Sequence, residues 1–314
     1  MNNLSILACP ECSIDLSKQE YDKLACPKCR KEYPVINKIP RFVNSENYVH
    51  SFGVEWTTYD VQRLEEDIEV FKVKTGIQPE EFKGKLVLDA GCGGGRYIYL
   101  SGQYGASLAA GVDMSQAVEK AGKLADKYNN VMIVQSDLMK LPFKPGTFDI
   151  VYSIGVLHHT SNTKKAFENI AKYVKPGGIL AIWVYRKNTF IQEIINSILR
   201  SVTTRLPYKV LHYLSVFGAF LGGIPVLNKT LSRIINFSNH PDWNLRVCDT
   251  FDWFSPKYQY HHTVKEVYGW FNELGFTDIK FLPPQKSGLL YNWVYNHNLI
   301  IGSGVNFQAR KPLK

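Results

Sequence analysis

Residues 86–95 combine an apolar run, an acid and a cluster of glycines, in the order Leu-Val-Leu-Asp-Ala-Gly-Cys-Gly-Gly-Gly. Such a run predicts a buried strand that leads into a tight turn, because glycine adopts backbone conformations closed to other residues and lets a ligand approach the main chain. A helix-compatible stretch at 96–104 follows. Since helix N-termini attract negative or polar groups, this turn is a candidate ligand-binding loop.

Two more acids stand at the ends of apolar runs. Asp113 ends the run 106–113, 24 positions after Asp89, and Asp137 follows the run that begins at Val131. A carboxylate at the end of the second strand can accept hydrogen bonds from both ribose hydroxyls of a nucleoside, and the expected separation is ~20 residues. Asp137 is placed to accept from an adenine amino group. Each acid alone could be an ordinary strand-end cap, but together they predict one crevice at the carboxyl ends of parallel strands.

Two later apolar runs, 148–153 and 174–185, extend the series; Leu-His-His follows the first and Lys-Pro-Gly-Gly lies at the start of the second. This order of motifs resembles class I S-adenosylmethionine (SAM) methyltransferases of the ubiquinone/menaquinone-biosynthesis type (methyltransferase type 11). The resemblance is detailed over 84–186 and looser beyond. A dinucleotide-binding loop would carry a third glycine at position 96, where this chain has Arg96, so the pattern favours SAM over NAD.

The resemblance implies an α/β fold with a Rossmann-like, doubly wound, seven-stranded sheet. Its last two strands, 277–282 and 298–302, would pair antiparallel at the sheet edge. Asp89 would lie near the methionine amino group of SAM and Leu138 beside its adenine. The expected cofactor-binding residues are Asp89, Gly91, Cys92, Gly93, Gly95, Asp113, Met114, Ser115, Asp137, Leu138 and Ser153.

Four cysteines near the N-terminus form two Cys-x-x-Cys pairs separated by thirteen residues. Each pair can turn both thiolates onto one ion, and two pairs supply a tetrahedral four-sulfur site, so a structural zinc is expected. A redox role is the alternative, but the βαβ setting for it is missing. The segment resembles small zinc ribbons that precede some bacterial methyltransferase domains, and its role, interaction or stabilisation, stays open. The expected metal ligands are Cys9, Cys12, Cys26 and Cys29.

The chain divides into five expected segments: a zinc ribbon (1–44), a bridging helical segment over the cofactor site (45–83), the SAM-binding core (84–187), a helical and aromatic lid insertion (188–262), and a C-terminal helix with edge strands (263–314). In the bridge, Phe52 and Trp56 either fold over the cofactor or pack the core edge. Thr263 with Glu266 forms an expected capping box for the helix 264–274.

The lid segment contains an amphipathic helix at 190–200 and a nearly all-apolar helix at 210–224, which is too short and broken to span a bilayer. Three interpretations stay open: a lid over a substrate pocket, an extra buried layer or dimer surface, and a patch that contacts a membrane surface. Aromatic, acidic and histidine residues are dense at 239–263, and the end of this stretch should face the pocket.

Composition sets broad limits. A hydrophobic content of 45% and a charged content of 21% describe an ordinary globular protein, and neither a secretory signal nor a spanning helix is recognisable. Thiols should therefore stay reduced, which predicts a cytoplasmic location. The net charge is +9, and residues 180–314 hold 15 Lys and Arg against 7 Asp and Glu. This excess fits a solvated surface, an anionic substrate, a nucleic acid or a peripheral membrane contact.

The leading functional hypothesis is methyl transfer from SAM to a small-molecule O, N or C nucleophile in a lidded pocket. The first alternative is an RNA methyltransferase that holds RNA with the ribbon and the basic C-terminal half. The second alternative is a non-catalytic protein that binds SAM or interacts through the zinc ribbon. Where the acceptor needs a base, histidine and tyrosine are the candidates. The catalytic residues expected are His158, His262 and Tyr258, with His159 and His261 also considered.

Overall fold

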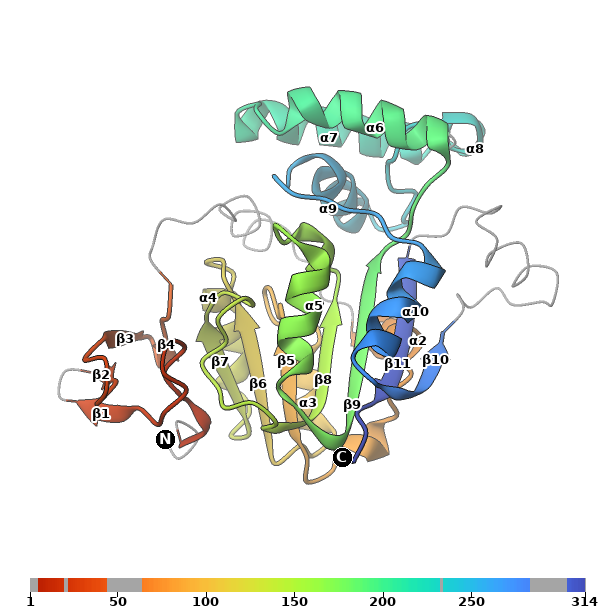
Figure 1. The fold of residues 1–314 in the computed structure, drawn as a ribbon. Coiled ribbons are helices and arrows are strands. Elements are labelled where there is room, and N and C mark those ends of the chain that lie inside the picture. The colour runs from red at the N-terminus through yellow and green to blue at the C-terminus, as the bar shows by residue number, and fades with distance from the viewer. Residues whose placement is uncertain (1–4, 20–21, 44–63, 232–233, 283–303, 314) are drawn as a thin grey trace.

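The computed structural model describes residues 5–19, 22–43, 64–231, 234–282 and 304–313. A seven-stranded mixed sheet forms its centre, in the order β10-β11-β9-β8-β5-β6-β7 (Figure 1). The strands are β5 (Leu86–Ala90), β6 (Leu108–Asp113), β7 (Val131–Gln135), β8 (Phe148–Ile154), β9 (Val174–Tyr185), β10 (Thr277–Phe281) and β11 (Gly304–Arg310). The expected α/β class with a seven-stranded sheet is confirmed.

Strands β5 to β9 run parallel to their neighbours, and β11 pairs antiparallel with both β9 and β10. Strand β10 matches the expected strand at 277–282. Its partner lies at Gly304–Arg310, while the expected strand at 298–302 falls outside the described residues. The chain passes from β5 through β6 to β7 and then returns to β8 on the other side of β5. Such a reversal opens a crevice at the strands' carboxyl ends.

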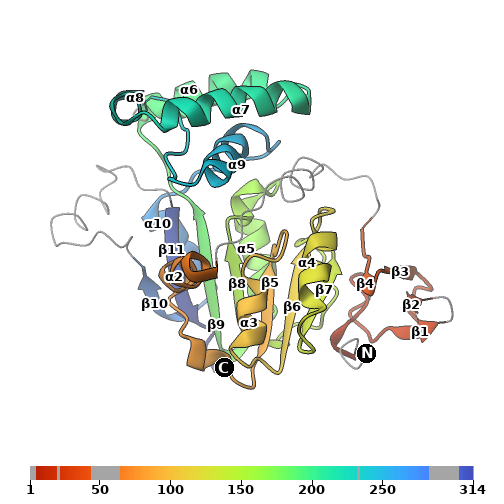
Figure 2. The same cartoon turned by 180° about the vertical axis from the view of Figure 1, so that it is seen from behind.

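Helices cover both faces of the sheet, which explains why β5 and β6 consist almost entirely of buried residues. One face carries α5 (Thr163–Ala171) and α10 (Val264–Glu273). The other carries α2 (Leu64–Thr75), α3 (Ile98–Gln103) and α4 (Val118–Ala125), as Figure 2 shows. The capping box that begins α10 is confirmed, since Glu266 N–H donates to Thr263 Oγ and Thr263 N–H to the Glu266 carboxylate. Phe52 and Trp56 lie outside the described residues.

The N-terminal segment forms a small four-stranded sheet: β1 (Ser17–Gln19), β2 (Lys23–Ala25), β3 (Glu32–Ile36) and β4 (Ile39–Pro40). It is attached to the β7 side of the main sheet. Phe42 N–H donates to the Gln135 carbonyl and Ala8 N–H to the Pro142 carbonyl, both at 2.8 Å. Arg41 is 6% exposed, donates to Gln135 Oε1 at 2.9 Å and pairs with Glu119.

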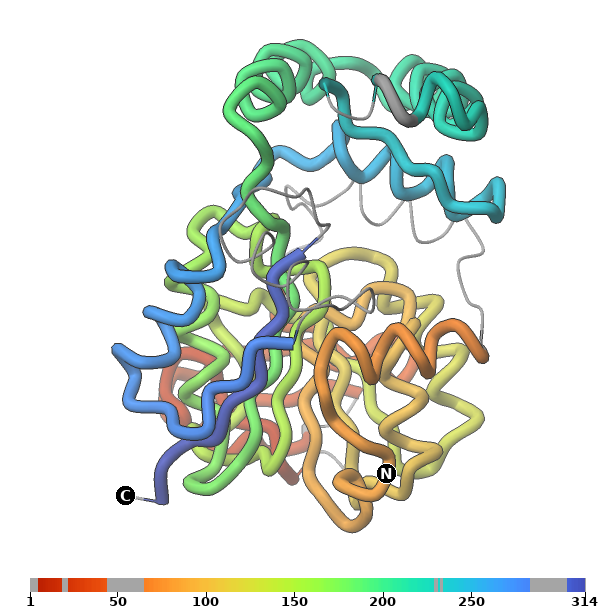
Figure 3. The backbone as a smooth tube through the Cα atoms, turned by 90° about the vertical axis from the view of Figure 1, so that its right-hand side faces the viewer, coloured from red at the N-terminus to blue at the C-terminus, as the bar shows by residue number. Residues whose placement is uncertain are grey.

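Four helices between β9 and α10 form a separate layer beyond the carboxyl ends of the strands. They are α6 (Phe190–Thr203), α7 (Tyr208–Gly222), α8 (Pro225–Leu231) and α9 (Trp243–Phe254). Figure 3 shows α9 between the core and the outer helices. The sequence analysis identified no helix in the aromatic stretch that forms α9; Asp242 begins it by accepting from Leu245 N–H at 3.0 Å. None of the described helices has both the length and the hydropathy to cross a membrane.

We expect Arg41→Ala to lower the free energy of unfolding by about 2 kcal/mol, since buried Gln135 Oε1 and the Glu119 carboxylate lose their donor. Urea denaturation followed by circular dichroism measures this. Lys38→Ala is the control, because the pair of Lys38 with Asp126 is exposed to solvent and contributes little. Equal unfolding free energies for both variants would show that the ribbon attachment does not stabilise the core.

Candidate active site

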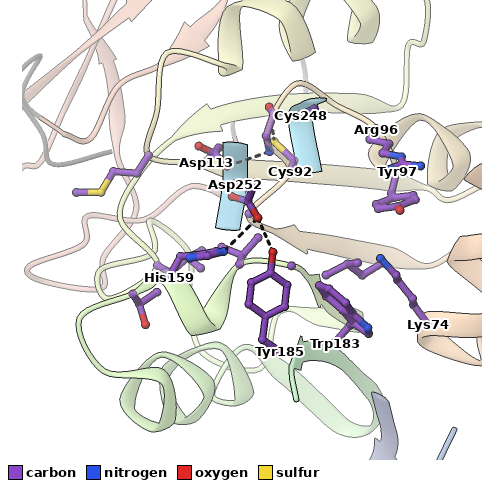
Figure 4. A pocket seen from close by; sticks show the side chains of 18 of the residues that line it. Lys74, Cys92, Arg96, Tyr97, Asp113, His159, Trp183, Tyr185, Cys248 and Asp252 are labelled. Atoms are coloured by element: carbon purple, nitrogen blue, oxygen red, sulfur yellow. Dashed lines mark hydrogen bonds and ion pairs between the residues drawn. The ribbon is translucent and has the colours of Figure 1, made fainter. Parts of the chain in front are cut away.

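A cavity of about 210 Å³ lies between the carboxyl ends of the strands and helix α9. Figure 4 shows side chains from both layers pointing into it. The core contributes the loops after β5, β6, β7 and β8, together with Lys74 of α2 and Trp183 and Tyr185 of β9. Helix α9 contributes Leu245, Cys248, Asp249 and Asp252.

The glycine loop after β5 forms one wall. Gly91 has a φ of +99°, and a Cβ atom there would lie 2.3 Å from Val156 Cγ2, so a larger residue would collide with the loop after β8. Gly95 has a φ of +94°, and a Cβ atom there would lie 3.2 Å from Ala121 Cα of α4. These two positions therefore require glycine, one for the turn beside the cavity and the other for the contact between loop and helix.

Asp113 stands at the end of β6 and borders the cavity. Its Oδ2 accepts from Gly93 N–H at 2.9 Å, and its Oδ1 accepts from Ser115 N–H and Oγ at 2.8 and 2.7 Å. Burial raises the pKa of this carboxyl, an effect that the hydrogen bonds from Ser115 oppose. A carboxylate offers about four acceptor positions, so capacity remains for the hydroxyls of a ribose.

Asp137 and Leu138 border the cavity beyond β7. Asp137 Oδ1 accepts from Met139 N–H at 2.8 Å, which holds the side chain in a turn at the end of the strand. Buried Asp89 lies at the end of β5, and its Oδ2 has no hydrogen-bond partner among the described residues. Burial raises the pKa of Asp89 well above its usual range. An orphaned acceptor beneath a glycine loop fits a bound group that brings its own donor.

Seven of the eleven expected cofactor residues line the cavity: Gly91, Cys92, Gly93, Asp113, Met114, Asp137 and Leu138. The other four lie behind this wall. Ser115 holds Asp113, Gly95 packs the loop on α4, and Ser153 Oγ donates to the Ala90 carbonyl at 2.6 Å. Asp89 is buried at the same strand end. The chemistry of this donor and acceptor set fits the ribose, adenine and amino-acid parts of SAM.

On the opposite wall, three polar side chains from distant parts of the chain converge. Tyr185 O–H donates to Asp252 Oδ2 at 2.5 Å, and His159 Nε2 lies 3.6 Å from the same oxygen. Although burial alone would raise the pKa of Asp252, the neighbouring His159, Tyr185 and Arg200 lower it below its usual value. His159 Nδ1 lies 3.0 Å from the Tyr258 carbonyl and must donate to it, so Nε2 is the basic nitrogen of the neutral ring.

The three residues expected to be catalytic lie outside the lining of the cavity. His158 is fully buried, stacks on Tyr185 with ring centroids 3.9 Å apart, and accepts from Tyr185 N–H. Burial lowers its pKa well below the usual value. His262 pairs with Glu266 at 2.9 Å and contacts Trp270. Tyr258 contributes its carbonyl to His159. Of the histidines considered, His159 is the one that borders the cavity.

Several lining residues were missed by the sequence analysis. Lys74 lies with Nζ 4.0 Å from the centre of the Trp183 ring, and burial lowers its pKa to about 7. Arg96 pairs with Asp67 at 2.6 Å. The expected bridging helical segment contains Lys74, but its approach to Trp183 joins residues 109 positions apart and has no local signal. Among the missed residues are Lys74, Arg96, Trp183, Tyr185, Asp249 and Asp252.

The four N-terminal cysteines come together in the ribbon, with all four sulfur atoms within 4.8 Å of one another. Cys9 Sγ and Cys29 Sγ are 3.7 Å apart. With Zn–S bonds of about 2.3 Å, the sulfur atoms of a tetrahedral zinc site lie about 3.8 Å apart. The cluster therefore fits a zinc ribbon, and none of its cysteines lines the cavity.

Comparison with protein families finds a methyltransferase domain at residues 88–182. Among curated proteins, a tRNA (carboxymethyluridine(34)-5-O)-methyltransferase of Arabidopsis thaliana is 37% identical over 105 residues, covering 32% of this chain and 24% of that protein. A phosphoethanolamine N-methyltransferase of Plasmodium falciparum is 31% identical over 152 residues, covering 47% of this chain and 51% of that protein. This chain thus spans about a quarter to a half of the length of these relatives.

A third relative, a ubiquinone biosynthesis O-methyltransferase of Neisseria meningitidis, is 29% identical over 109 residues, which cover 33% of this chain and 46% of that protein. A crystal structure of a SAM-dependent methyltransferase from Mesorhizobium loti aligns with a TM-score of 0.44 and 18% identity, over 74% of this chain and 93% of that one. The matched region contains the glycine loop, Asp113 and Asp137, which border the cavity. Residues 88–182 of this chain therefore match a methyltransferase domain, and this region is similar in sequence to methyltransferases that act on different acceptors.

Proposed function

We propose that this protein transfers a methyl group from SAM to a small-molecule acceptor held between the strand ends and α9. One observation supports this proposal: two different sets of side chains line the same cavity. The glycine loop lies on one wall with Asp113 and Asp137, and the opposite wall holds His159, Tyr185 and Asp252. The first set suits a nucleoside cofactor. The second supplies an acid–base group beside aromatic surfaces, which suits an acceptor.

When bound, SAM supplies an electrophilic methyl group. The residues of this chain would bind SAM and the acceptor, orient them toward each other and exclude water. Asp113 would accept from the ribose hydroxyls, Asp137 from the adenine amino group, and Asp89 from a donor on the amino-acid part. Helix α9 closes the cavity opposite the loop. We propose that the lid orders the acceptor in line with the methyl group and keeps bulk water away.

We propose His159 as the general base for an acceptor that must lose a proton. Its Nε2 faces the cavity wall beside the Asp252 carboxylate, which stabilises the imidazolium that forms. Tyr185 fixes Asp252 through its hydroxyl. Lys74, whose pKa is lowered to about 7, adds a second group that can change its charge near neutral pH.

An RNA acceptor is the second candidate, because the Arabidopsis relative is named as a tRNA methyltransferase. The small-molecule proposal is favoured by the position of the cavity between the strand ends and α9, and by the exposed apolar side chains that lie beside the basic residues of α6 and α7, where a groove for RNA would be polar. Binding to RNA would also weaken steeply with salt, since phosphate contacts release counterions.

We propose a structural zinc ion at Cys9, Cys12, Cys26 and Cys29, which leaves no open coordination position for catalysis. Its role in this proposal is to fold the ribbon, whose buried Leu24 and Tyr33 continue into the core cluster. Cysteines that stay out of disulfides need a reducing compartment, so the proposal includes a cytoplasmic location.

Asp113→Ala should weaken binding of S-adenosylhomocysteine about 100-fold, because two charge-assisted hydrogen bonds to the ribose are lost. Isothermal titration calorimetry measures the change, with circular dichroism to verify folding. Asp126→Ala is the matched control, since this exposed acid at the end of α4 pairs with Lys38 and does not line the cavity. Unchanged affinity in Asp113→Ala would remove this cavity as the cofactor site.

His159→Ala should lower kcat by about 10²- to 10⁴-fold with little change in the affinity for S-adenosylhomocysteine, because proton removal is lost and cofactor binding is not. Turnover is followed as tritiated methyl transferred from SAM to the solvent-soluble fraction of a cell extract, and separately to total RNA. His240→Ala is the control, since His240 pairs with Glu66 and does not line the cavity. Label in RNA alone would replace the small-molecule proposal; unchanged turnover in His159→Ala would exclude the base.

The purified protein should contain one zinc per chain by plasma mass spectrometry. Cys26→Ala should lose most of it and lower the thermal midpoint, because the remaining three sulfurs leave the tetrahedron incomplete. Cys248→Ala is the control, since this cysteine lies on α9 and not in the cluster. Full zinc content in Cys26→Ala would contradict the four-sulfur site.

A further inference from the structure

Helix α6 turns its polar side toward the protein. Gln192 and Asn196 are buried, and the guanidinium of Arg200 donates to the Trp253 and Pro256 carbonyls at 2.8 and 2.5 Å. The opposite side is apolar and exposed. This is the reverse of an amphipathic helix on an ordinary domain, which buries its apolar side. The exposed side chains of α6 are Phe190, Ile191, Ile194, Ile198 and Val202.

Helix α7 is apolar around most of its circumference, but its small residues face inward and its bulky residues face outward. Ser215, Ala219 and Gly222 are buried. A Cβ atom on Gly222 would lie 2.1 Å from the Ser238 carbonyl oxygen, so the inner side has no room for larger groups. Phe217 is 61% exposed. The exposed side chains of α7 are Val210, Tyr213, Leu214, Phe217 and Phe220.

These two sets of exposed side chains lie on one outer layer, which we call the outer lid face. Figures 1 and 2 show α6 and α7 side by side, with α9 between them and the sheet. An apolar area of this kind is unusual on the surface of a soluble monomer and marks a surface that is covered by something else.

The charge around the outer lid face is of one sign. Of the seven Lys and Arg in residues 186–235, Arg186 is buried and Arg200 points toward the protein, while the one acid, Glu193, is contacted by His261 Nδ1 at 2.8 Å. Lys187 precedes α6, and Arg205 and Lys209 lie at the connection to α7; all three are exposed. Cations at the ends of apolar helices suit phosphate groups at the level where a bilayer meets water.

We propose that the outer lid face docks on an anionic lipid bilayer, with α6 and α7 lying in the plane of the interface. The apolar side chains would enter the acyl boundary and the basic residues would meet lipid phosphates. A second copy of this chain fits less well, because a two-fold contact places the same surface on both sides. Basic residues would then face basic residues, and the one acid of this segment is already engaged by His261. The proposal does not depend on the proposed activity.

The test is co-sedimentation of the full-length protein with vesicles of phosphatidylcholine, alone or mixed with phosphatidylglycerol. We expect binding to the mixed vesicles that falls as salt is raised. Phe217→Ser and Ile198→Ser should each weaken partitioning about tenfold through lost apolar burial. Arg205→Gln and Lys209→Gln should each weaken it about fivefold. Leu274→Ser, an exposed apolar position at the end of α10, is the matched control and should bind as the unchanged protein does.

Circular dichroism verifies that each variant remains folded, and calorimetry with S-adenosylhomocysteine tests the cofactor site separately, so a failure here is distinct from a failure of the proposed function. Light scattering measures the mass in solution. Absence of binding to mixed vesicles overturns the proposal. A dimer that Phe217→Ser dissociates, without vesicle binding, assigns the outer lid face to self-association instead. Equal loss of binding in Leu274→Ser would show non-specific adsorption and also overturn it.

Discussion

The hydrogen bond from Gly93 N–H to Asp113 Oδ2, at 2.9 Å, joins the ends of β5 and β6 and sets the shape of the cavity. It fixes the glycine loop against the acid that would meet a ribose. The sheet makes this possible, because parallel strands deliver their carboxyl ends to one edge. Ser115 then holds the other oxygen of Asp113, so the carboxylate has one orientation before any ligand arrives. Preorganisation of this kind reduces the conformational entropy that the side chain and loop lose when a ligand binds.

Local patterns in the sequence predict seven of the residues that line the cavity. The glycine loop, Asp113 and Asp137 each follow an apolar run directly, so strand ends and acids can be recognised together. The cysteine pairs are equally local, and their four sulfurs do converge. Gly95, Ser115 and Ser153 were expected to contact the cofactor, and the structure places them one step behind the lining, because the same motif contains both contacting and supporting residues.

The opposite wall, with His159, Tyr185 and Asp252, which we call the acceptor wall after its proposed role, could not be predicted in the same way, since it depends on long-range contacts. Tyr185 and Asp252 are 67 positions apart, and His159 and Tyr258 are 99 apart. In the Leu-His-His motif, the short helical turn Leu157–His159 directs His159 to the cavity and His158 into the core beside Tyr185. Sequence spacing alone does not distinguish two adjacent histidines. Similarly, α9 has no clear apolar period because one side meets the cavity and the other meets α7.

Helix α9 lies between the cavity and the outer helices α6 and α7. Its side chains line the cavity through Asp249 and Asp252, and its other side packs against the small residues of α7. One helix layer therefore separates the outer lid face from the acceptor wall. The two helices pack closely, since a Cβ atom on Gly218 of α7 would lie 3.1 Å from Thr250 Cγ2 of α9. The outer lid face and the environment of His159 Nε2 are therefore connected through one helix, which carries Asp252.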